Sequence, residues 1–164
     1  MSRKYKQGVF VPKNPQKYKG NVNNIIYRSS WEQIAFRFCD QTTDVIWWQS
    51  EETVIEYISP VDNNSHRYYM DITMCVRQAS GKEQVFMVEI KPKEQTVFPQ
   101  RKRKKELTFL KEVETYSINA AKWNAAKKVC ERHGYKFLIW TQDHLLPKKP
   151  ARLKRFKKPV DKRK

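Results

Sequence analysis

The chain has 164 residues, of which 39% are hydrophobic and 13% aromatic, a length and composition that fit one folded domain. No run of about 18 apolar residues predicts a membrane span, the N-terminus lacks an apolar signal core, and three widely spaced cysteines form neither a disulfide framework nor a CxxC metal pair. With 34 Lys and Arg against 17 Asp and Glu, the net charge of +17 predicts a polyanionic partner, because neutralised phosphates release condensed counterions.

The N-terminal part predicts a basic extended arm, a helix and a strand, in that order. Residues 1–24 are rich in Lys, Asn, Pro and Gly and show no clear period, so we expect an extended arm. Residues 29–40 place apolar side chains at helical spacing, and Ser29 with Glu32 fits a capping box at the helix start. Residues 53–58 predict a strand.

The middle of the chain predicts a β-hairpin. Residues 67–77 are typical of a long strand, and residues 84–91 of a second one. The turn-forming residues 79–82 connect the two, so we expect them to pair antiparallel. Pro92 ends the second strand, and a charged connection follows.

The C-terminal part predicts a helix over 116–133 that stops at Gly134, then a strand over 136–141. Residues 147–164 carry ten Lys and Arg against one Asp and predict a basic tail. Such a tail is expected either to bind nucleic acid or to remain a solvated end. The element order predicts an α/β nuclease domain over 25–146, with a mixed sheet flanked by helices.

Three charged residues on the expected hairpin predict a chemical site. Glu89 and Lys91 share one face of their strand because side chains alternate, and Asp71 on the neighbouring strand can reach the same face. Two carboxylates suit Mg²⁺, which would polarise a phosphoryl oxygen, while Lys91 could orient a water or stabilise negative charge. The alternative is an ordinary cross-strand ion pair, and these three residues alone do not decide between the two.

An acid on one strand, a hairpin turn and Glu-x-Lys on the next strand resemble the PD-(D/E)xK nuclease superfamily. The surrounding sequence, from Tyr27 to Glu32, from His66 to Asp71 and from Glu89 to Pro92, is similar to the endonuclease subunits of heteromeric cut-and-paste transposases. It is more similar still to the head-completion nucleases of T-even-type bacteriophages. That resemblance covers most of the chain and implies a restriction-endonuclease-like fold. One position departs from the superfamily pattern: Met70 stands where a proline usually precedes the first acid.

The resemblance also implies a glutamate on the first helix, and Glu32 matches it. Glu32 would then complete a catalytic and metal-binding set with Asp71 and Glu89, although a capping role explains its position too.

Weaker candidates for DNA contacts are polar or basic residues near the expected site. Those along the last helix share a face that could equally be core. The candidates are Arg67, Gln95, Arg101, Lys102, Arg103, Lys104, Lys105, Asn119 and Lys122.

The expected function is therefore a Mg²⁺-dependent deoxyribonuclease, with Mn²⁺ as an alternative ion. Its basic segments would hold double-stranded DNA by the phosphates with little sequence preference. The phage resemblance implies cutting or trimming of packaged DNA in head completion, a portal or neck protein as partner, and location in the host cytoplasm or the virion. The other hypotheses are a non-catalytic neck protein and a transposase-type cutting subunit.

Overall fold

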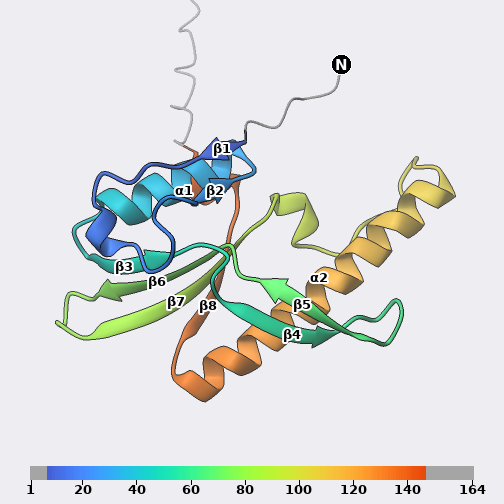
Figure 1. Ribbon diagram of the computed structural model, residues 1–164. Helices are drawn as coiled ribbons and strands as arrows, with labels where there is room; N and C mark the ends of the chain where they lie inside the picture. The colour runs from blue at the N-terminus through green and yellow to red at the C-terminus, as the bar shows by residue number, and fades with distance from the viewer. Residues whose placement is uncertain (1–6, 147–164) are drawn as a thin grey trace, which may run out of the picture.

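A mixed four-stranded sheet lies at the centre of the structure, a computed structural model that describes residues 7–146 (Figure 1). The strand order is β3-β6-β7-β8, with β6 antiparallel to both neighbours and β7 parallel to β8. The strands are β3 (Val45–Gln49), β6 (Ile72–Arg77), β7 (Glu83–Ile90) and β8 (Lys136–Trp140). The predicted hairpin is confirmed as β6 and β7, and the predicted last strand as β8.

Two helices cover opposite faces of this sheet, each accompanied by a small two-stranded ribbon (Figure 1). One face carries α1 with the β1–β2 ribbon, and the other carries α2 with the β4–β5 ribbon. These elements are α1 (Ser30–Gln41), α2 (Glu106–His133), β1 (Gly8–Val9), β2 (Ile26–Tyr27), β4 (Val54–Ile58) and β5 (Ser65–Tyr69). Short helical segments are η1 (Pro15–Lys17), η2 (Lys93–Gln95) and α3 (Gln142–Leu145). The predicted α/β class, a mixed sheet flanked by helices, is confirmed.

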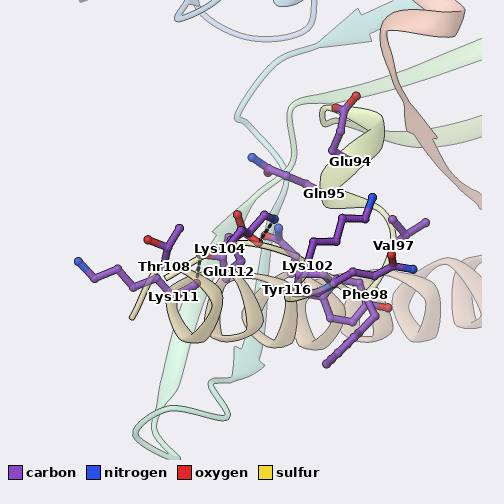
Figure 2. Close-up of a pocket in the computed structure, with 14 residues that line it drawn as sticks. Glu94, Gln95, Val97, Phe98, Lys102, Lys104, Thr108, Lys111, Glu112 and Tyr116 are labelled. Carbon is purple, nitrogen blue, oxygen red and sulfur yellow. Dashed lines mark hydrogen bonds and ion pairs between the residues drawn. The ribbon is translucent and has the colours of Figure 1, made fainter. Parts of the chain in front are cut away.

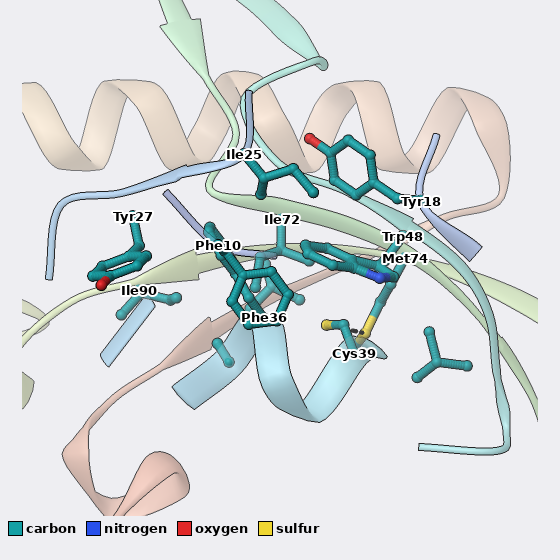
Figure 3. Close-up of a cluster of buried hydrophobic side chains, with 13 residues drawn as sticks. Phe10, Tyr18, Ile25, Tyr27, Phe36, Cys39, Trp48, Ile72, Met74 and Ile90 are labelled. Carbon is teal, nitrogen blue, oxygen red and sulfur yellow. Dashed lines mark hydrogen bonds between the residues drawn. The ribbon is translucent and has the colours of Figure 1, made fainter. Parts of the chain in front are cut away.

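Strand β7 divides its side chains between the two cores. Val88 and Ile90 pack into the cluster under α1, where Phe36 and Trp48 are also buried (Figure 3). Met87 packs into the second cluster, against α2. Because side chains alternate along a strand, Glu89 shares the α2 face with Met87.

Both predicted helix boundaries with clear end signals are confirmed. Ser29 caps α1, its hydroxyl accepting a hydrogen bond from the Glu32 amide. Gly134 ends α2 in the left-handed conformation, with φ of 69°, which glycine adopts without steric cost.

Helix α2 begins ten residues before the predicted start. The helix observed is Glu106–His133, whereas the sequence predicts 116–133. The first turns of the helix fall in the segment that is described from the sequence as a charged connection. Leu107 and Leu110 in these turns are exposed, so the segment has no buried face. A helix shows periodic apolar residues only where one of its faces packs against the protein. This part of α2 extends past the sheet, so it lacks that pattern (Figure 1).

The strand predicted over 67–77 is two strands. The chain leaves the β4–β5 ribbon after Ser65–Tyr69 and enters the central sheet at Ile72–Arg77. The break falls at Met70 and Asp71, and Met70 is fully buried between the two. Hydrophobic patterning continues across the break, with no Gly or Pro to mark it.

The N-terminal segment is not a separate extended arm where the structure describes it. Phe10 and Tyr18 are buried in the core under α1, so residues 7–24 belong to the domain. The carboxylate of buried Asp40 accepts hydrogen bonds from the backbone amides of Lys13 and Asn14, at 2.9 and 3.0 Å, which holds this segment against α1.

The predicted basic tail over 147–164 lies outside the described residues. Of the helices in residues 7–146, none combines the length and apolar character needed to cross a membrane.

Candidate active site

The end of β7 and the residue that follows it bring a carboxylate and an ammonium group together. The Lys91 Nζ lies 2.9 Å from Glu89 Oε1. The hydroxyl of Tyr68, on β5, donates to Glu89 Oε2 at 2.5 Å. The Glu89 side chain is only 3% exposed, so a surface ion pair, the alternative interpretation of the sequence, does not describe it.

Asp71 lies beside Glu89, as the hairpin pairing predicted. It immediately precedes Ile72, which pairs with Val88, so the register places Asp71 opposite Glu89. Its Oδ2 accepts a hydrogen bond from the Ile90 amide at 2.7 Å. The break between β5 and β6 therefore delivers the carboxylate of Asp71 to the end of β7.

The electrostatics of this cluster are those of acids held together out of water. Burial and the neighbouring charge of Glu89 raise the pKa of Asp71 well above its ordinary value. Burial alone would lower the pKa of Lys91, but the charge of Glu89 and the hydrogen bond to it outweigh burial and raise it, so Lys91 is a cation at neutral pH. One ammonium thus faces two carboxylates.

Glu32 borders this cluster without joining it as a third close carboxylate. Its carboxylate accepts hydrogen bonds from the Arg28 amide at 2.7 Å and from the Ser29 hydroxyl at 3.0 Å. Its charge still influences the pKa of Asp71 and of Lys91. Within residues 7–146, no group of three or more His, Cys, Asp and Glu side chains is arranged to hold a metal ion. The predicted three-carboxylate metal set is therefore not assembled in this conformation.

Lys122 of α2 stands over the other side of the cluster. Its Nζ lies 5.5 Å from the centre of the Tyr68 ring and 5.6 Å from that of Tyr57. Burial, together with the positive charge of Lys91, lowers its pKa. From the sequence, Lys122 is only a candidate DNA contact. In the structure, Lys122 lies close enough to Asp71 and Glu89 for their charges to influence its pKa.

Tyr68 is the site residue that sequence reasoning missed. Its burial and the adjacent negative charge of Glu89 raise the pKa of its phenol, so it remains a hydrogen-bond donor. The only sequence signal was its place in a Tyr-Tyr-Met-Asp run, which does not tell which of the two tyrosines points inward. Pairing of β5 with β4 determines that Tyr68 is buried and Tyr69 exposed.

The remaining predicted DNA contacts fall into two groups. Several line an open groove between η2 and α2: Gln95, Lys102, Lys104 and Asn119. The others are exposed and have no place in the cluster: Arg67, Arg101, Arg103 and Lys105. Arg67 alternates with Tyr68 along β5 and so faces away from Glu89.

The donor set fits a hard divalent cation. Mg²⁺ is usually bound through one or two carboxylates and keeps several waters, so Asp71 and Glu89 suffice as protein ligands. The pKa of Asp71 is raised first by burial and then by the charge of Glu89, and a nearby cation would offset both effects.

Comparison with known proteins gives the family. The model of the TnsA-like endonuclease N-terminal domain matches residues 42–142, which include Asp71, Glu89 and Lys91 but not Glu32. The chain is also similar to the head completion nuclease of Enterobacteria phage T4, with 41% identity over 144 residues that cover 84% of this chain and 92% of the relative. No solved structure matches the chain. The chain therefore belongs to the TnsA-like endonuclease family.

Proposed function

We propose that this protein is a metal-dependent nuclease that hydrolyses phosphodiester bonds of DNA at Asp71, Glu89 and Lys91. The observation that carries the proposal is Asp71 opposite the buried Glu89, beside the Lys91 ammonium, in a chain of an endonuclease family. Burial and the nearby charge of Glu89 raise the pKa of Asp71, and groups with such perturbed pKa values cluster at functional sites.

Each residue has a distinct role in this proposal. Mg²⁺, or Mn²⁺ in its place, would be held by Asp71 and Glu89 and would supply the Lewis acid for the scissile phosphate. The Lys91 ammonium, 2.9 Å from Glu89, would orient the attacking water and stabilise negative charge that develops on the phosphate. Tyr68 and the Ile90 amide would orient Glu89 and Asp71, respectively.

Glu32 and Lys122 would act from the borders of the cluster. The charge of Glu32 reaches Asp71 and Lys91, so we propose that it orients Lys91 and adds to the negative potential that attracts a cation. Lys122 lies on α2 over the Tyr68 ring, and we propose that its ammonium group contacts a DNA phosphate.

The substrate proposed is double-stranded DNA, bound with little sequence preference. The net charge of +17 provides the phosphate attraction, and phosphate contacts carry no sequence information directly. The similarity to the phage head completion nuclease supports a role in head completion, with packaged DNA as substrate and a portal or neck protein as partner. The protein would then act in the host cytoplasm during assembly and could remain in the virion.

The deciding experiment measures cleavage of plasmid and linear DNA with Mg²⁺, with Mn²⁺ and with EDTA. It compares the wild type with Asp71→Asn and Lys91→Met, and with Lys93→Met as a matched control, because Lys93 is exposed and pairs instead with Asp143. We expect cleavage by the wild type and by the control only, and only with metal. DNA binding measured in EDTA should persist in all four proteins.

Other outcomes would favour other functions. Salt-sensitive binding without cleavage by the wild type, in either metal, would indicate a non-catalytic neck protein. Cleavage that survives both Asp71→Asn and Lys91→Met would place the chemistry elsewhere. Cleavage that appears only with an added recombinase would indicate a transposase-type subunit.

A further inference from the structure

A groove runs between the segment that follows β7 and the first half of α2 (Figure 2). Its volume is about 930 Å³, within the range of pockets that hold ligands of several rings. One wall is the segment 94–104, and the other is the α2 stretch 108–119. The proposed chemistry at Asp71, Glu89 and Lys91 does not use most of this groove.

The two walls meet in an aromatic pair. The rings of Phe98 and Tyr116 lie edge to face, with centroids 5.5 Å apart and an interplanar angle of 81° (Figure 2). Phe98 is 58% exposed, although burying an aromatic ring of this size would be favourable. An exposed ring face in a groove is a surface on which a planar ligand can stack.

Lysine side chains line the same groove as this aromatic pair. Lys102 and Lys111 line the groove, as does Lys104, which is paired with Glu112. The basic run 101–105 borders the same wall. A groove that combines aromatic faces with lysines is chemically suited to a strand that carries both bases and phosphates.

Helix α2 connects the groove to the acidic cluster, because it carries Asn119 in the groove and Lys122 over Tyr68. Asn119 is only 6% exposed, and its side-chain nitrogen has no hydrogen-bond partner within the described residues. A buried amide donor without a partner is costly, and a base or phosphate oxygen would satisfy it. One turn further along α2, Lys122 faces Tyr68, whose hydroxyl bonds to Glu89.

We propose that this groove binds unpaired nucleotides of a DNA strand next to the cleavage point, with a base against Phe98 and phosphates near Lys102 and Lys111. The proposal deepens the proposed function and rests on it for the identity of the substrate. Fully paired DNA cannot occupy the groove in this way because its bases are stacked within the duplex. An apolar peptide is disfavoured because it would remove the lysines from water without neutralising them.

The test compares two labelled oligonucleotides in EDTA, so that binding is measured independently of cleavage. One is a short blunt duplex, and the other is the same duplex with a thymidine single-stranded extension. Fluorescence anisotropy gives the affinity of the full-length wild type, Phe98→Ala, Phe98→Trp and Leu110→Ala for each. Leu110 is the matched control, since it is 54% exposed, lies on α2 and does not line the groove.

We expect the wild type and Leu110→Ala to prefer the extended duplex by the same factor. Phe98→Ala should reduce that preference at least about fivefold, the equivalent of one base stacked on an aromatic ring, and Phe98→Trp should restore it. Equal affinity of the wild type for both probes would overturn the proposal, as would a preference that Phe98→Ala leaves unchanged, the result expected if the groove holds a peptide. These binding measurements need no cleavage. A negative result here would contradict the groove proposal alone, whereas absence of cleavage in the plasmid assay would contradict the proposed nuclease function.

Discussion

At the scale of single residues, the acidic cluster is stabilised by donors that differ in kind. Glu89 is held by the phenol of Tyr68 and the ammonium of Lys91, whereas Asp71 is held by a backbone amide. Hydrogen bonds to a charged carboxylate are stronger than those between neutral groups, so these donors offset part of the cost of burial.

The Tyr68 hydroxyl is expected to matter for rate more than for folding. Tyr68→Phe removes one donor to Glu89 and keeps the ring that packs in the core. Losing a group that orients a metal ligand costs about 10–100-fold in activity or metal affinity. We therefore expect cleavage to fall by about that factor, measured as the initial rate on plasmid DNA over a range of Mg²⁺ concentrations.

The neighbouring residue provides the control for this change. Tyr69→Phe removes a hydroxyl from an exposed side chain of the same strand and should leave cleavage unchanged. Equal losses in the two variants would mean that Tyr68 does not act through Glu89. Unfolding curves of both variants would show whether any loss arises from stability instead.

At the scale of elements, Asp40 joins the N-terminal segment to α1. Its side chain is fully buried and accepts two backbone amides, from Lys13 and Asn14. Its own carbonyl oxygen accepts hydrogen bonds from the side chains of Asn14 and Lys17, both at 3.0 Å. The segment that carries Phe10 and Tyr18 into the core is therefore held at one polar junction.

Asp40→Ala is expected to destabilise the protein, because the part-buried amides of Lys13 and Asn14 lose their acceptor. Leaving a buried polar group unsatisfied costs about 1–3 kcal/mol, so we expect the free energy of unfolding in urea to fall by at least that amount. Asp44→Ala removes an exposed carboxylate just beyond α1 and is the matched control, with no change expected. A variant at Asp40 as stable as the wild type would show that the junction contributes nothing.

Elements whose signals are local were predictable, and those that depend on tertiary pairing were not. The Ser29 cap, the Gly134 stop and the alternation of Val88 and Glu89 all act within a few residues, and each was confirmed. The break at Asp71 depends on which strand pairs with which, and no residue near it marks a turn. Strand β3 was not predicted from the sequence, because its two tryptophans are as typical of a buried core segment as of a strand.

The candidate site follows the same division. The Glu89–Lys91 spacing and the hairpin turn predicted from sequence alone the sheet face on which Asp71, Glu89 and Lys91 meet. The contribution of Tyr68 depends on how the β4–β5 ribbon folds over the cluster, and the groove beside Phe98 depends on where α2 begins. Neither the fold of the ribbon over the cluster nor the start of α2 leaves a periodic pattern in the sequence. Both arrangements are therefore visible only in the structure.

At the scale of the whole molecule, the proposed function assigns DNA attraction and chemistry to different parts of the chain. The net charge of +17 is distributed over the sequence, and ten of its 34 Lys and Arg lie in residues 147–164. The acidic cluster is a buried site on the domain, surrounded by donors. Affinity and cleavage rate should therefore respond to different substitutions.

Replacing the ten Lys and Arg of residues 147–164 with Gln should weaken DNA binding and leave the cleavage rate at saturating DNA unchanged. Each phosphate that the variant no longer neutralises should reduce the slope of log affinity against log salt by about 0.9, a change that anisotropy titrations over a series of salt concentrations can measure. A variant with residues 147–164 scrambled, which keeps the composition and changes the order, is the matched control. If charge alone attracts DNA, the scrambled chain should keep the slope of the wild type. If scrambling weakens binding as much as neutralisation does, the order of these residues is recognised, and charge alone does not explain their role.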